Sequence, residues 1–216
     1  MSAVLAPVSA PDSAPASSSP ASAGRPLASS TYRFVAIPSA VADAVRATLA
    51  APKYGHPAHV EVAKGYGPCR HCLRTFRVGE ERRILFTYDA FDGVEPLPQP
   101  GPVFIHAEAC ARYDAGAGFP DDLRAHPVTL VAFARGRAQR AEVHVPAAPA
   151  GAPPGAVHGA THGAVEAALD ALFARGDVDY VHVRDTDAGC YDLRVERAAS
   201  AQAPGAPADV EEIPSC

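Results

Sequence analysis

Four residues in two short segments have the side chains and the spacing of a metal site. Cys69 and Cys72 are separated by two residues, and His106 precedes Cys110 by four positions. Zinc favours thiolate and imidazole ligands in tetrahedral geometry, and a two-residue gap on a turn lets both sulfurs approach one ion. We therefore predict a Cys3His zinc site formed by Cys69, Cys72, His106 and Cys110.

A turn and a helix start would have to bring these ligands together. Gly67-Pro68 interrupts the preceding extended segment, so the first cysteine pair should lie on a turn. Residues 103–105 form a short apolar run that predicts a buried strand, and residues 107–113 have the composition of a helical turn. On a helix, residues four apart share a face, so His106 and Cys110 would point the same way.

The same residues also allow two other interpretations. Cys69 and Cys110 could be small buried apolar residues, with His106 in an ordinary hydrogen bond. Alternatively, Cys69 could be the nucleophilic or redox thiol of a small enzyme, its pKa lowered by Arg70 or His71, with Cys72 as the resolving thiol. Four protein ligands would leave no open position for a substrate, so a filled metal site favours a structural role.

The rest of the central segment predicts an α+β fold with a mostly antiparallel sheet and a few packed helices. Alternating or apolar runs bounded by Gly, Pro and Asp indicate strands, and the apolar spacing of Val165, Leu169 and Leu172 indicates a helix that Thr161 could cap. Pro38-Ser39 likewise predicts a capped helix start. The strands are expected at 32–37, 58–63, 83–88, 103–105, 128–134, 141–145, 177–183 and 190–195.

Composition divides the chain into three parts. Residues 1–30 are almost entirely Ala, Ser and Pro, and residues 199–216 are similar, so we predict a disordered leader and a disordered tail around one domain at 31–198. The formal net charge of −5 gives no reason to expect nucleic acid or an anionic membrane as a partner. Five cysteines, two of them in a Cys-x-x-Cys pair, favour a reducing, cytoplasmic setting.

Four blocks of sequence together resemble one bacterial family. They are GPCRHCLR at 67–74, GPVFIHAEAC at 101–110, YVHVR at 180–184 and GCYDLRVER at 189–197. The chain is similar in these blocks to the domain of unknown function 1203 (DUF1203), over nearly all of the segment from Tyr32 to Arg197.

The resemblance names a family without an activity. It implies that Pro-Cys-Arg at 68–70 and Gly-Cys-Tyr at 189–191 are family hallmarks, whereas the positions of Cys72, His106 and Cys110 vary between members. It also directs attention to Arg70, Cys190 and Arg194 as a shared pocket between the cysteine turn and the last strand. We expect a zinc-stabilised domain that binds a small molecule or a protein partner, with the Cys69 enzyme as the alternative.

Overall fold

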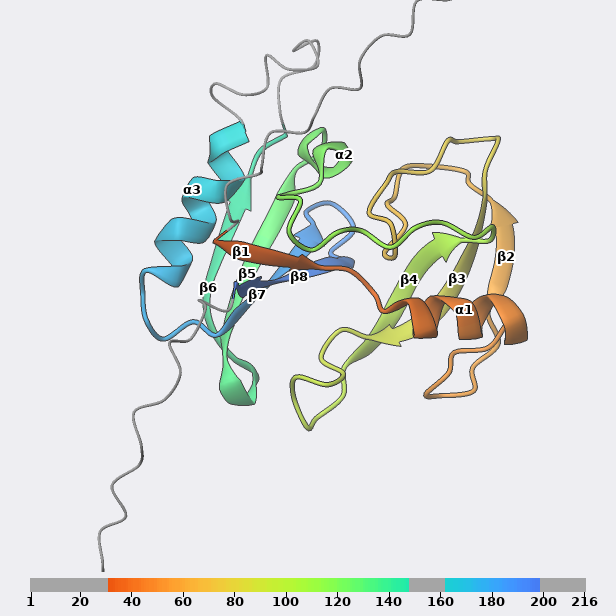
Figure 1. The fold of residues 1–216 in the computed structure, drawn as a ribbon, viewed down its shortest axis with the longest axis horizontal. Helices are drawn as coiled ribbons and strands as arrows, with labels where there is room; N and C mark the ends of the chain where they lie inside the picture. Colours follow the sequence, from red (N-terminus) through yellow and green to blue (C-terminus); the bar gives the residue numbers. More distant parts are fainter. Residues whose placement is uncertain (1–30, 148–161, 199–216) are drawn as a thin grey trace, which may run out of the picture.

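The structure is a computed structural model that describes residues 31–147 and 162–198. The predicted leader, the predicted tail and the proposed cap Thr161 lie outside these residues. The described residues form eight strands in two antiparallel sheets, which lie side by side (Figure 1). This arrangement confirms the predicted α+β class with mostly antiparallel strands.

The larger sheet has five strands in the order β1-β8-β7-β5-β6. Helix α3 (His162–Phe173) packs on one face, where its Leu169 and Phe173 meet Leu130 and Val181 in a buried apolar core. Because side chains alternate between the two faces of a strand, the other face of the sheet turns away from α3. The strands are β1 (Tyr32–Val35), β5 (Val128–Ala134), β6 (Ala138–Val145), β7 (Tyr180–Asp185) and β8 (Tyr191–Arg197).

The smaller sheet has three strands in the order β2-β3-β4. They are β2 (His59–Val62), β3 (Arg82–Asp89) and β4 (Pro100–His106). Helix α1 (Ser39–Thr48) contributes Val45 to a second apolar core, which also contains Ile84, Ile105 and Cys69. One of the predicted metal ligands is therefore part of the smaller core.

Two short elements complete the described fold. Helix α2 (Asp121–Arg124) follows the smaller sheet, and the 3-10 turn η1 (Arg135–Arg137) joins β5 to β6. None of the helices in 31–147 and 162–198 is long and apolar enough to cross a membrane.

Three local predictions need correction. Residues 107–113 are irregular rather than helical. Strand β4 begins at Pro100, earlier than the strand predicted at 103–105, because Pro100 and Gly101 pair with the end of β3 at the sheet edge. Ser39 begins α1 as expected, but its hydroxyl makes no cap and contacts His71 Nε2 at 3.0 Å.

Candidate metal centre

The turn that carries the first cysteine pair is closed by its own backbone. The N–H of Cys69 donates to the carbonyl of Arg74 at 2.9 Å, and the N–H of Leu73 donates to the carbonyl of Cys69 at 2.7 Å. Leu73 has a left-handed φ of 58°, which costs a non-glycine residue free energy. Its side chain is buried in the core of the larger sheet, whereas Cys69 lies in the core of the smaller sheet. The turn is thus held between the two sheets.

The second pair of ligands follows the end of β4. His106 is the last residue of this strand, and its backbone N–H donates to Cys69 Sγ at 3.3 Å. The chain then runs along the cysteine turn, where the N–H of Tyr113 donates to the carbonyl of His71 at 3.0 Å. These backbone groups bond to the turn instead of forming a helix, so Cys110 reaches the cluster by a different path from the one predicted.

The four predicted ligand residues converge on one point. One ligand atom from each of Cys69, Cys72, His106 and Cys110 lies within 4.8 Å of all the others. The Sγ atoms of Cys69 and Cys110 are 3.9 Å apart, and Cys72 Sγ is 3.4 Å from His106 Nδ1. With zinc–ligand bonds of about 2.3 Å to sulfur and about 2.0 Å to nitrogen, a tetrahedron has edges of roughly 3.8 Å (S–S) and 3.5 Å (S–N). The arrangement can therefore hold a metal ion.

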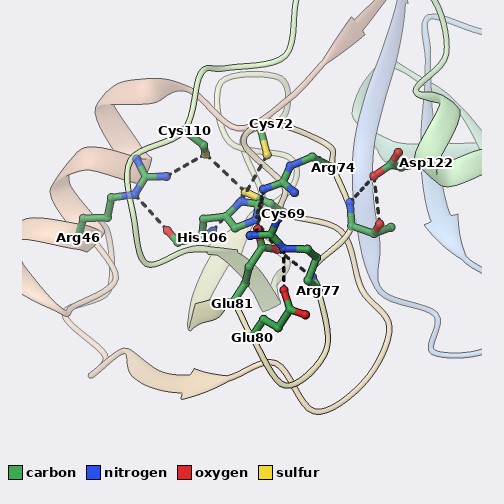
Figure 2. A network of polar contacts seen from close by, with 11 residues as sticks. Arg46, Cys69, Cys72, Arg74, Arg77, Glu80, Glu81, His106, Cys110 and Asp122 are labelled. Atoms are coloured by element: carbon green, nitrogen blue, oxygen red, sulfur yellow. Dashed lines mark hydrogen bonds and ion pairs between the residues drawn. The ribbon is translucent and has the colours of Figure 1, made fainter. Parts of the chain in front are cut away.

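Donors around Cys110 stabilise negative charge on its sulfur. Arg46 of α1 donates to Cys110 Sγ at 3.3 Å, and His71 Nδ1 is also 3.3 Å from this sulfur. Figure 2 shows Arg46 reaching the cluster from one side, where it also donates to the carbonyl of His106 at 3.1 Å. Three thiolates around a divalent cation would carry one net negative charge, which the Arg46 guanidinium would balance.

His106 is oriented by an acidic residue on the far side of its ring. Its Nδ1 faces Cys72, and its Nε2 lies 3.4 Å from Glu81 Oε2. A histidine that binds a metal through one nitrogen commonly donates its other N–H to a carboxylate, which fixes the tautomer. Burial alone would raise the pKa of Glu81, but the backbone N–H of Arg77 and the guanidinium of Arg74 lower it to about 2. Glu81 is thus an anion that can accept this hydrogen bond.

The thiols of the cluster are electrostatically coupled. Hydrogen bonds with Cys110 and Cys72 lower the pKa of Cys69, whereas hydrogen bonds with Cys110 and Cys69 raise the pKa of Cys72. Burial alone would lower the pKa of His106, but its contacts with the sulfurs of Cys110 and Cys69 raise that pKa to about 10. Of these two thiols, Cys69 is therefore the one favoured as a thiolate, the form that binds metal.

The three residues of the pocket suggested by the resemblance occupy different surroundings. Arg70 is buried, donates to the carbonyl of Tyr191 at 2.9 Å and pairs with Asp192 at 2.9 Å, which joins the cysteine turn to β8. Cys190 is partly buried and lines a cavity of about 260 Å³ that Arg70 does not line. Arg194 pairs with Glu196 on the same strand at 2.7 Å.

Sequence reasoning missed several groups that support the cluster. Each lies 25 or more residues along the chain from the cluster residue that it contacts: Arg46 and His71 contact Cys110, and Glu81 contacts His106. Ser39 in turn contacts His71. One general rule could have pointed to such a group: a histidine that binds a metal usually has a carboxylate partner, so one was to be expected for His106. The sequence offers many acidic residues, however, and only the hairpin geometry of β3 and β4 selects Glu81.

The fold and the cluster define an α+β protein of two antiparallel sheets with a Cys3His group able to bind a metal ion. A family model described as a protein of unknown function (DUF1203) matches residues 66–197, a range that includes all four cluster residues. The chain belongs to the DUF1203 family. Comparison with curated proteins and with solved structures finds no match.

Proposed function

We propose that this protein is a zinc-stabilised binding domain in which the Cys3His centre has a structural role. The observation that carries the proposal is the convergence of four ligand atoms within 4.8 Å of one another. The ligands come from two segments separated by the hairpin of β3 and β4. A bound ion would therefore join the cysteine turn to the segment after β4.

The chemistry of the donor set favours zinc over other common ions. Thiolates are soft ligands, and three of them with one imidazole suit zinc far better than the oxygen ligands that magnesium or calcium require. Two of the sulfurs also accept N–H groups, Cys110 from Arg46 and Cys69 from the His106 backbone, which are the outer partners that orient metal-bound thiolates.

Two features favour a structural centre over a catalytic one. Four protein ligands complete a tetrahedron and leave no open position for substrate or water. Cys69, the thiol of the alternative enzyme hypothesis, has no exposed surface, so a substrate cannot reach its sulfur without local opening. We also infer a reducing, cytoplasmic setting, in which such thiols stay available to a metal.

The test is the amount of zinc bound per chain, measured by elemental mass spectrometry on untagged protein purified without chelator. We expect about one zinc per chain in the parent protein. Cys69→Ser and Cys110→Ser change ligands from the two separate segments, and each should abolish stoichiometric zinc.

Cys190→Ser is the matched control, because Cys190 is a partly buried free cysteine outside the cluster. It should retain the full zinc content. A parent protein without zinc, or variants of Cys69 and Cys110 that keep it, would overturn the proposal.

A further inference from the structure

A cleft lies on the face of the larger sheet that α3 does not cover. On β7, Val181 and Val183 point toward the α3 core, so His182 and Arg184 point to the opposite face. On the neighbouring strand β5, Thr129 and Val131 share this face, because Thr129 is paired with Arg184 and Val131 with His182. The floor of the cleft is therefore formed by strands β5 and β7, whereas Thr186 and Gln99 of its lining come from the adjoining connections.

The cleft combines an apolar floor with polar walls. It has a volume of about 480 Å³ and is lined by Val131 and Phe133 together with Thr129, Thr186, Gln99 and Arg184. Sites for small organic ligands commonly have this volume and a few convergent polar groups above an apolar surface.

Arg184 is a cation of the cleft whose N–H donors are largely unused by the protein. Within the described residues it makes no ion pair, and its one hydrogen bond goes from Nη1 to the carbonyl of Gly189 at 3.2 Å. Its Nε is buried without a hydrogen-bond partner. A buried donor left unpaired costs free energy, and a guanidinium is suited to binding a carboxylate or a phosphate through two parallel bonds.

The other charged groups of the cleft are already engaged. Arg137 donates to the carbonyl of Leu97 at 2.9 Å and to Gln99 Oε1 at 2.6 Å. Asp185 Oδ1 accepts the N–H of Ala188 at 2.7 Å.

On the remaining wall, Glu142 accepts from Gln139 at 3.2 Å and lies 3.5 Å from His144 Nε2. Of the two arginines in the lining, Arg184 therefore has more N–H donors left for a ligand.

Hydroxyl groups beside Arg184 add a second polar contact. Thr129 Oγ1 lies 2.9 Å from His144 Nδ1 and 3.0 Å from Thr186 Oγ1. When both ring nitrogens of His144 carry a proton, Nε2 faces Glu142 and Nδ1 donates to Thr129. Thr129 then donates to Thr186, so the Thr186 hydroxyl keeps its proton for a ligand. The cation and this hydroxyl together suit an oxyanion.

An adjoining cavity gives room for the body of such a ligand. It has a volume of about 260 Å³ and shares Gln99, Arg184 and Gly189 with the cleft. Its other lining residues are mainly apolar or aromatic, among them Val103 and Tyr191. Arg184 thus stands at the junction of a polar and an apolar space.

We propose that this cleft binds a small organic anion, with its carboxylate or phosphate on Arg184 and Thr186 and its apolar body over Val131 or in the adjoining cavity. The proposal does not depend on the metal centre. Its ligand class follows from an arginine without an ion-pair partner beside hydroxyl donors and an apolar surface.

The test is isothermal titration of the full chain with phenyl phosphate and with phenylacetate, which present the two anionic groups on a similar body. We expect at least one probe to bind, and the stronger one identifies the preferred group. Benzyl alcohol, which has the ring without the charge, should not bind measurably. Inorganic phosphate should bind more weakly than phenyl phosphate if the apolar body contributes.

Two variants locate the binding. Arg184→Gln should weaken the better probe at least tenfold, and Thr186→Val should weaken it severalfold, while Arg175→Gln removes an exposed arginine outside the cleft and should change nothing. Zinc content and thermal unfolding of each variant show separately whether the fold and the metal centre persist. Failure of both anionic probes to bind, or equal affinity in folded Arg184→Gln, would overturn the proposal.

Discussion

The two sheets of this protein are stabilised by different means. The larger sheet packs Leu, Val and Phe side chains against α3 in a continuous apolar core. The core of the smaller sheet includes Cys69, and the segments at 63–79 and 107–119 beside this sheet are mostly irregular. A region with little regular structure gains most from a cross-link between its segments. We therefore expect the metal to matter for the smaller sheet and little for the larger one.

The largest effect should come from removing a metal ligand. Cys69→Ser should lower the free energy of unfolding by more than about 4 kcal/mol, since loss of a bound metal is among the most destabilising changes. Hydrogen exchange should show lost protection at Arg70 and Ile105, with protection retained at Leu130 and Val181. Uniform loss of protection across both sheets would show that the metal stabilises the two sheets equally.

The next effect concerns the link between the cysteine turn and the larger sheet. Arg70→Met leaves the buried carboxylate of Asp192 without its partner, which should cost about 3–5 kcal/mol in chemical denaturation. Because Asp192→Asn removes the orphaned charge, the double variant should recover part of this loss. An undiminished loss in the double variant would show that packing, not charge, explains the effect of Arg70.

A substitution in the larger core should separate stability from metal binding. Leu169→Ala removes a fully buried side chain from α3 and should lower the free energy of unfolding by about 3 kcal/mol. Zinc content should stay at the parent value, because the cluster is built outside this core. Loss of zinc in the folded variant would mean that the two regions are not independent.

The smallest effect tests a buried histidine between the two regions. His182 has no exposed surface, and neither ring nitrogen has a hydrogen-bond partner among the described residues. Burial, with the charges of Arg184 and Arg194, lowers its pKa well below 6.5. In the unfolded chain His182 binds a proton near pH 6.5, whereas in the folded chain it stays neutral. The free energy of unfolding therefore falls as the pH drops below this value.

His182→Leu keeps a similar volume and removes the titrating group. Between pH 7 and pH 5 the parent should lose about 2 kcal/mol more stability than this variant, measured by denaturant unfolding at each pH. Equal pH dependence in the two proteins would show that His182 is protonated, or opens to solvent, in the folded state.

The strands and the ligand set could be predicted because their signals are local. All eight strands were expected near their observed positions, since apolar alternation and turn residues mark them. The four cluster residues were identified from ligand type and short spacing, yet the helix expected after His106 is absent. In this segment the N–H of Tyr113 bonds to His71 of the cysteine turn and that of Ala107 to Arg82, long-range contacts that spacing cannot reveal.

The cleft and the groups that surround the metal cluster could not be predicted in the same way. Arg46 and Glu81 meet the ligands only after α1 and the β3–β4 hairpin have packed. Arg184 stands out because the fold buries its Nε without a hydrogen-bond partner, which is a property of packing and not of sequence. The pocket suggested by the resemblance at Arg70, Cys190 and Arg194 stays a prediction.

X-ray absorption at the zinc edge of the purified protein tests the central claim most directly, because it reports the atoms bound to the metal. We predict three sulfur neighbours at about 2.3 Å and one nitrogen at about 2.0 Å. In any residual zinc-bound fraction of the Cys110→Ser protein, one sulfur neighbour should be lost. A first shell of oxygen and nitrogen alone, or of four sulfurs, would contradict a site built from Cys69, Cys72, His106 and Cys110.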